Sequence, residues 1–135
     1  NGVEIMCLID TNIFLEVLLS QGKKDLCKKI LDTNIGNQYL SDFSLHSIGV
    51  ILFKNGKENI FKKFVVDVVP KVEIITLSKE LYKNLANAKN DTGLDFDDVY
   101  QFKIAEEYGL EIITMDKDFN RVRDKIKIIF VEHVA

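Results

Sequence analysis

The stretch Met6-Cys7-Leu8-Ile9-Asp10-Thr11-Asn12-Ile13-Phe14 decides the fold of this chain. Four apolar residues lead directly into an acid and two short polar residues, and apolar character returns at Ile13. A short apolar run that ends in turn-forming residues is typical of a buried central strand, and it places Asp10 at the carboxyl end of that strand. Open α/β sheets keep their active sites at this edge. We therefore expect the other functional acids at the ends of later strands and at the starts of helices.

The length and composition describe one folded domain. The chain has 135 residues, of which 47% are hydrophobic and 29% are charged. A chain near this length buries roughly 70% of its unfolded surface and builds a core without disulfides. We therefore expect residues 1–135 to form a single domain. Residues 1–5 precede Met6, which could serve as a natural start, so we expect some of them to be foreign to the natural protein.

Charge and cysteine content bear on location and partners. No apolar run approaches the roughly 18 residues that cross a bilayer, and the amino terminus lacks the basic segment of a signal peptide. Two cysteines are too few for a disulfide framework, so we expect a cytoplasmic protein without membrane association. The formal net charge of −3 gives no overall signature of a nucleic-acid binder. A basic patch or a bound divalent cation can reverse that field locally.

Strands alternate with helices along the chain, which predicts a mainly parallel sheet with helices on both faces. The expected fold class is therefore α/β, with three α/β/α layers and about five strands. The expected strands are residues 6–9, 38–40, 72–76, 111–114 and 127–131. The expected helices are residues 12–20, 23–33, 43–53, 57–68, 79–89 and 96–108. Residues 90–95 are expected to be a polar loop, and residues 115–123 a loop with room for one helical turn.

Polar residues at the expected helix starts are interpreted as caps. Asn12 is able to cap the first helix, and Ser41 or Asp42 the third. Asp95 stands three residues before Asp98, which approximates a capping box for the last long helix.

Three acids take equivalent places in this scheme. Asp10 follows the first strand, Asp98 lies in the first turn of a helix, and Asp116 follows the strand that ends at Thr114. If these ends converge, the carboxylates crowd together and resist joint ionisation unless a cation binds them. Carboxylate oxygens suit Mg²⁺ or Mn²⁺. A metal held in this way activates water for cleavage of a phosphodiester.

Each acid also has a purely structural interpretation. Asp98 could complement the amino terminus of its helix, and Asp10 could cap the helix that follows it. Asp116 and Asp118 could be ordinary turn residues. Only the combination of an acid after a strand, an acid at a helix start and a second acid after a strand favours a functional site.

Two signatures at the ends of the chain support that combination. Ile9-Asp10-Thr11-Asn12 reads (L/I)DTN. Leu94-Asp95-Phe96-Asp97-Asp98-Val99, followed by Ala105, Gly109 and Ile113-Thr114-Met115-Asp116-Lys117-Asp118-Phe119, reads D…A…G…(T/S)xDxxF. Together they resemble the PIN-domain family, the fold of VapC-like toxins and related endoribonucleases. The resemblance extends over essentially the whole chain from Met6.

The resemblance implies an endoribonuclease that binds one or two Mg²⁺ or Mn²⁺ ions and uses them to generate an attacking hydroxide. The implied catalytic and metal-binding residues are Asp10, Asp98 and Asp116, with Asp97 as the fallback for the third family acid. The implied supporting residues are Asn12 and Thr114, through hydrogen bonds, and Asp95 and Asp118, through outer contacts only. The implied partners are RNA, a second copy of the chain in a homodimer and, where the chain is a toxin, an antitoxin protein.

A group of lysines bears on RNA binding. These residues are Lys54, Lys57, Lys62 and Lys63, and they surround one predicted helical hairpin. They could bind the phosphate backbone of RNA, or they could simply form the solvent-exposed face of the two helices.

The chain departs from the family at one acid. The family pattern includes a glutamate on the helix after the second strand, where this sequence has His46 or Ser47. Asp42 begins the same helix and is interpreted as its N-cap. Two interpretations stay open: an active ribonuclease, or a catalytically weak or inactive PIN-fold module that binds RNA or protein. A third is a receiver-type phosphoryl-transfer domain, which needs an acid pair where this chain has Asp10 alone.

Overall fold

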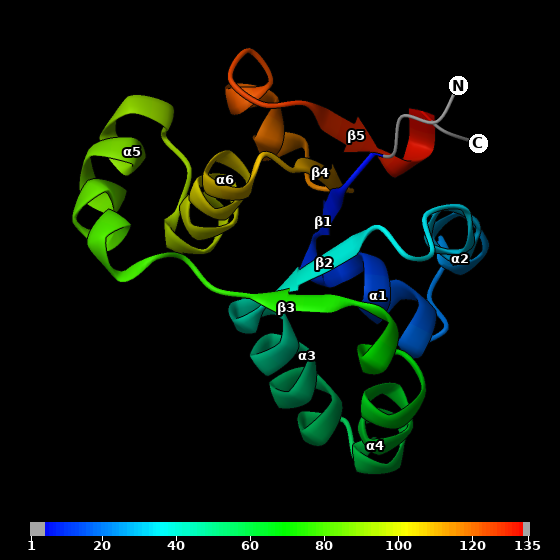
Figure 1. Ribbon diagram of the computed structural model, residues 1–135. Helices are drawn as coiled ribbons and strands as arrows, with labels where there is room; N and C mark the ends of the chain where they lie inside the picture. The colour runs from blue at the N-terminus through cyan, green and yellow to red at the C-terminus, as the bar shows by residue number, and fades with distance from the viewer. Residues whose placement is uncertain (1–4, 134–135) are drawn as a thin grey trace.

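The computed structural model describes residues 5–133 and contains a five-stranded parallel sheet between two layers of helices (Figure 1). The strands are β1 (Cys7–Ile9), β2 (Gln38–Ser41), β3 (Glu73–Ile75), β4 (Glu111–Thr114) and β5 (Ile128–Phe130). The five predicted strands and the α/β/α class are confirmed. The expectation of foreign residues at the start of the chain concerns residues 1–4 and Ile5, and the first four lie outside the described residues.

The order of the strands across the sheet is β3-β2-β1-β4-β5. This order differs from the 2-1-3-4-5 order of flavodoxin-like domains, the class to which receiver domains belong. The receiver-type interpretation is therefore wrong for this chain.

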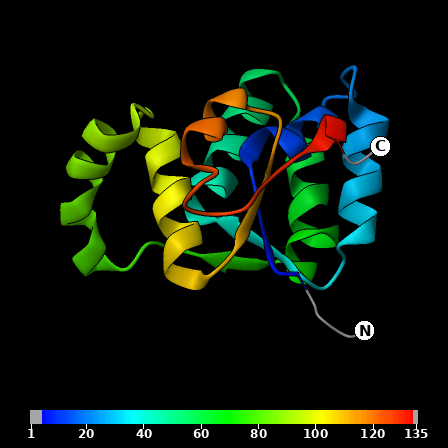
Figure 2. The ribbon, with the colours of Figure 1, turned by 90° about the horizontal axis from the view of Figure 1, so that it is seen from above.

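The helices form one layer on each face of the sheet (Figure 2). One layer consists of α1 (Thr11–Leu18), α2 (Lys24–Thr33), α3 (Asp42–Lys54) and α4 (Glu58–Asp67), and the other of α5 (Leu85–Thr92) and α6 (Phe96–Tyr108). Short 3₁₀ helices are η1 (Val69–Lys71), η2 (Lys79–Asn84), η3 (Lys117–Val122) and η4 (Val131–His133). Within residues 5–133, no helix combines the length and the apolar character needed to span a bilayer.

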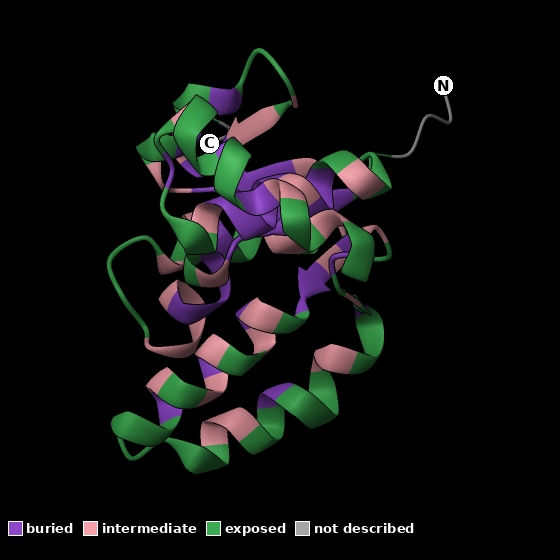
Figure 3. Ribbon diagram, turned by 90° about the vertical axis from the view of Figure 1, so that its left-hand side faces the viewer, coloured by how far each residue is buried: buried purple, intermediate pink, exposed green. Residues whose placement is uncertain are grey.

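The central strand β1 is buried on both faces, which explains its continuous apolar sequence. Cys7 and Ile9 pack with the α1–α4 layer, and Leu8 packs with the α5–α6 layer. All three are fully buried, and Figure 3 shows buried segments gathered along the middle of the sheet. Burial raises the pKa of the Cys7 thiol to about 11, so this thiol stays protonated and inert at neutral pH.

The start of α1 differs from the prediction. The N-cap is Asp10 and not Asn12, because the Asp10 carboxylate accepts a hydrogen bond from the Thr11 amide at 3.0 Å. Asp10 has the extended backbone of a cap, with φ −68° and ψ 150°. The first acid of the signature therefore ends a strand and begins a helix at the same time.

Two further caps and one loop also differ. Ser41 caps α3 by accepting the Ser44 amide at 3.0 Å, so the interpretation of Asp42 as the N-cap is wrong. Asp95 is the N-cap residue of α6 but makes no side-chain cap bond, so the predicted capping box does not form. The predicted loop at residues 90–95 begins later, because α5 continues to Thr92 before the chain turns with a left-handed φ of +75° at Gly93.

Candidate metal centre

The carboxyl ends of β1 and β4 lie side by side in the middle of the sheet. Ile9 lies opposite Ile113 in the parallel pair of these strands. From β1 the chain extends the sheet first through β2 and β3 on one side, and later through β4 and β5 on the other. Such a switch point is the place where open α/β sheets bind ligands. Asp10 directly follows β1, and Asp116 lies two residues beyond β4.

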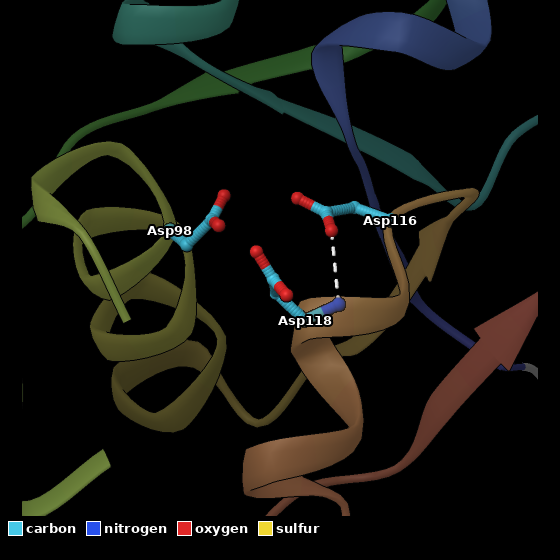
Figure 4. Close-up of side chains that lie close together, drawn as sticks. All are labelled: Asp98, Asp116 and Asp118. Atoms are coloured by element: carbon cyan, nitrogen blue, oxygen red, sulfur yellow. Dashed lines mark hydrogen bonds between the residues drawn. The ribbon is translucent and has the colours of Figure 1, made fainter. Parts of the chain in front are cut away.

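Three carboxylates gather near this switch point. Asp98, Asp116 and Asp118 each offer one oxygen, and these three atoms all lie within 4.8 Å of one another. Asp98 lies in the first turn of α6, whereas Asp116 and Asp118 come from the start of η3. In Figure 4 the three side chains point toward one another. Asp116 also caps η3, since its Oδ1 accepts the Asp118 amide at 2.9 Å.

Asp10 lies beside this group but is buried, with 8% of its surface exposed. Its Oδ2 accepts the Thr114 hydroxyl at 2.7 Å, and its Oδ1 accepts the Gln101 side-chain amide at 3.3 Å as well as the Thr11 amide. Burial raises the pKa of Asp10 above its ordinary value, and the three hydrogen bonds oppose that rise. The Asp116 charge raises it further.

A buried polar network that the sequence motifs do not predict underlies Asp10. The Gln101 amide that binds Asp10 also donates to the Ser44 hydroxyl at 2.9 Å. That hydroxyl is also hydrogen-bonded to the hydroxyls of Ser41 at 3.1 Å and Thr11 at 2.8 Å. Gln101 was detectable as a polar residue in an otherwise apolar part of α6, three residues after Asp98 and therefore on a similar face.

Crowding has an electrostatic consequence for Asp98. Burial, and next the charges of Asp116, Asp10 and Asp95, raise the pKa of Asp98 to about 7. The group therefore resists full ionisation at neutral pH. A hard divalent cation such as Mg²⁺ or Mn²⁺ accepts several carboxylate oxygens and relieves this repulsion. The donor set of the cluster fits such an ion.

Most of the sequence matches a known family. The family model of the PIN domain matches residues 7–125. The chain belongs to the PIN domain family. A comparison with curated proteins finds no match.

Solved structures share this PIN fold. The chain is similar to a protein of a toxin–antitoxin complex from Klebsiella pneumoniae, with 23% identity, a TM-score of 0.69, and coverage of 84% of this chain and 89% of that one. The chain is also similar to FitAcB from Neisseria gonorrhoeae, with 18% identity and a TM-score of 0.74. That match covers 96% of this chain and 100% of the other. A third similar structure is VapC20 from Mycobacterium tuberculosis, a sarcin-ricin loop cleaving toxin, with 12% identity and a TM-score of 0.73. That match covers 84% of this chain and 92% of the other. At these identities the similarity shows the fold alone.

The supporting residues predicted for this PIN domain take different places. Thr114 is buried and joins two acids, because its hydroxyl donates to Asp10 and accepts the Asp116 amide at 2.9 Å. Asn12 is exposed on α1, and among the described residues no hydrogen bond joins it to Asp10. Asp118 lies within the carboxylate cluster, whereas the exposed residues Asp95 and Asp97 are not members of it.

The departure from the PIN pattern falls on α3. His46 is exposed and lines an apolar groove of about 720 Å³ together with Val50 and Phe53. Ser47 is half-buried and lies three residues after Ser44, whose hydroxyl belongs to the buried network. Residues three apart on a helix are neighbours, so Ser47 is nearer than His46 to the face that borders the network. Asp42 is exposed and accepts the Tyr100 hydroxyl at 2.8 Å.

The lysines of the α3–α4 hairpin are exposed. Helix α3 begins beside the carboxyl end of β2 and runs away from it. Lys54 is 12 residues after Asp42 and therefore about 18 Å further along the helix axis. Lys57 lies in the turn beyond it. These two lysines therefore lie at the end of α3 that is away from the carboxyl end of β2.

Proposed function

We propose that this PIN domain is an endoribonuclease that depends on Mg²⁺ or Mn²⁺. The observation that carries the proposal is the cluster of Asp98, Asp116 and Asp118 beside buried Asp10. Asp98 and Asp116 would hold the cation directly, with Asp10 as a ligand or as an acceptor that orients bound water. The position of Asp118 supports a closer contact than the outer one that the family resemblance implies. A divalent cation at this place supplies charge neutralisation for the phosphodiester and a water of lowered pKa.

The chain's own residues hold the acids in place. The Thr114 hydroxyl and the Gln101 amide occupy one oxygen each of Asp10, which favours its ionised form. The pKa of Asp98 is raised to about 7, so this carboxyl group loses its proton near neutral pH. Since a cation must displace that proton, we expect metal affinity and cleavage to increase with pH up to and beyond this value.

Cleavage of a labelled RNA pool tests the proposal. We expect cleavage with Mg²⁺ or Mn²⁺, none with chelator, and a loss of at least about tenfold for Asp98→Asn. Asp97→Asn is the matched control, because it removes the same charge from the neighbouring residue, which is exposed and outside the cluster. Cleavage that persists with chelator, or that falls equally in both variants, contradicts the proposed mechanism.

We also propose that the chain is the cytoplasmic toxin of a toxin–antitoxin pair and forms a homodimer. The similarity to a protein of the Klebsiella pneumoniae toxin–antitoxin complex supports the toxin part of this proposal. Expression of the chain should arrest growth, the Asp98→Asn variant should not, and a small reading frame beside the gene should relieve the arrest. Light scattering should give about twice the 15.5 kDa mass of one chain. Unimpaired growth would contradict the proposal of a toxin. A monomeric mass would contradict the proposal of a homodimer.

The second candidate is a catalytically weak or inactive PIN module that binds RNA or protein. The observation in its favour is the absence of a carboxylate at both His46 and Ser47. Ser47→Glu would restore an acid near the buried network, and we expect it to increase the Mn²⁺ affinity about tenfold or more. His46→Glu, which faces the groove, should change it little. If the wild type cleaves RNA as fast as Ser47→Glu, the second candidate is contradicted.

A further inference from the structure

Phe96 is an aromatic side chain that the fold leaves in solvent. It is the first residue of α6, yet it is 59% exposed. The apolar contacts at this end of the helix come instead from Leu94 and Val99, which are both 1% exposed. Val99 is the fourth residue of the helix and Leu94 precedes its N-cap, the two positions that commonly pack together at a helix start. Packing of the core therefore does not account for Phe96.

The Phe96 ring is nevertheless held in place. It stacks on Tyr100, with ring centroids 6.4 Å apart and planes 20° from parallel. Tyr100 is buried, donates its hydroxyl to Asp42 at 2.8 Å and accepts the Leu77 amide at 3.2 Å. Tyr82, which is 46% exposed, completes the group with its ring centroid 5.8 Å from that of Tyr100. We call Phe96, Tyr100 and Tyr82 the aromatic platform.

The aromatic platform and the carboxylate cluster each have a residue in the first turn of α6. Phe96 and Asp98 belong to the same first turn of α6, about 3 Å apart along the axis and roughly 200° apart around it. The two side chains therefore lie across a helix whose diameter is about 10 Å. Asp42, which holds Tyr100, begins α3 at the carboxyl end of β2. The platform and the cluster therefore both lie at the edge formed by the carboxyl ends of the strands, on different sides of α6 and within reach of one RNA strand.

We propose that the aromatic platform stacks an unpaired base of the RNA within a few nucleotides of the bond that the cluster cleaves; this inference rests on the proposed function. Every base offers a π-face to an aromatic ring, so such stacking tolerates any sequence. Asp95 and Asp97 are exposed on either side of Phe96, and they repel phosphate while leaving a neutral base unaffected. Bases in a duplex cannot splay onto a ring. The stacked base therefore has to lie in a single-stranded or looped part of the RNA.

Cleavage kinetics with Mn²⁺ test this proposal. Phe96→Ala should raise KM for a single-stranded RNA at least about fivefold, the lower end of what one stacked base contributes, and should leave kcat within about twofold. Phe96→Trp should retain a low KM. Phe53→Ala is the matched control, because Phe53 is 56% exposed but lies near the far end of α3. Its KM should equal that of the wild type.

A fluorescent base reports stacking without cleavage. In the Asp98→Asn background, 2-aminopurine is placed in turn at each nucleotide near the cleaved bond. At one of these positions its fluorescence should be quenched, and Phe96→Ala should abolish that quenching. Normal cleavage with an unchanged KM in Phe96→Ala overturns this inference and leaves the proposed function standing. Absence of both cleavage and quenching overturns both. Light scattering that shows a dimer dissociating in Phe96→Ala would assign Phe96 to a protein interface and overturn the inference alone.

Discussion

The Gln101 side chain lies between Asp10 and Ser44 and donates both of its amide hydrogens. Its Nε2 is 3.3 Å from Asp10 Oδ1 and 2.9 Å from Ser44 Oγ. Its Oε1 is buried without a hydrogen-bond partner among the described residues. A buried acceptor without a partner costs free energy, so this position is not optimised for stability alone. The Gln101 amide instead donates a hydrogen bond to the buried Asp10 carboxylate, which lies at the candidate site.

Substitution of Gln101 tests this role. Gln101→Met removes both donor bonds but also the unpartnered Oε1, so we expect a loss of only about 1 kcal/mol in the free energy of unfolding. Gln101→Glu places a second carboxyl group beside Asp10. The loss in stability should be larger at pH 8 than at pH 5, because ionised carboxylates repel each other and ionisation increases with pH. Urea denaturation at the two pH values measures this difference. Equal losses at both pH values would contradict the proposed contact.

Asp98 predicts how stability depends on pH in the absence of metal. Its pKa is raised from an ordinary value of 3.8 to about 7, so the folded state binds the proton more tightly than the unfolded state does. The stabilisation is fully present below pH 3.8 and is lost as pH rises toward and past 7. With chelator present, the wild type should be less stable at pH 8 than at pH 5, and Asp98→Asn should flatten this slope. Asp97→Asn should keep the wild-type slope.

At the scale of elements, the sequence predicted what depends on local pattern. The apolar run before Asp10 sufficed for β1. The acids at Asp95 and Asp98, with Gly109 as the stop, sufficed for the bounds of α6, although the capping box itself does not form. The caps were less predictable, because Asn12, Asp10 and Ser41 are all good capping residues and tertiary contacts decide between them. Nor did the sequence distinguish Asp118 from an outer contact, since its approach to Asp98 depends on how η3 packs against α6.

Arg121 connects these two elements. It lies on η3, three residues after Asp118, and its guanidinium donates to the Gly93 carbonyl at 2.8 Å, just before α6. Because the bond is exposed, Arg121→Met should cost less than about 1 kcal/mol in stability. It should nevertheless weaken Mn²⁺ binding several-fold, because Asp98 and Asp118 would no longer be held at a fixed separation.

Arg123→Met is the control for that substitution. Within residues 5–133, the Arg123 side chain bonds only to Asn120 of its own segment, at 3.5 Å. Its removal should therefore leave Mn²⁺ affinity unchanged. Calorimetric titration with Mn²⁺ compares the two variants. Equal affinities would mean that the α6–η3 separation is fixed by the core rather than by Arg121.

At the scale of the whole molecule, the strand order brings together residues that are distant in sequence. Asp10 and Asp116 meet because β1 and β4 are neighbours at the switch point of the sheet. Asp98 joins them because α6 directly precedes β4 in the chain and packs against that strand and α5. The resulting concentration of negative charge opposes the compact state, in a chain whose net charge is already −3. A bound cation would therefore stabilise the fold as well as the site.

That linkage gives the last prediction. A cation that binds only the folded state, at a concentration 100 times its Kd, adds about 2.7 kcal/mol to the free energy of unfolding. For a chain of 135 residues this corresponds to an increase of about 10 °C in Tm. We expect Mn²⁺ to produce such an increase at pH 8 and a smaller one at pH 5.5, where protonated Asp98 competes with the metal. Asp98→Asn should lose most of the increase and Asp97→Asn little. An equal increase in Tm for both variants would mean that Mn²⁺ binds outside the carboxylate cluster. The crowded acids would then lack the counter-charge that we propose for them.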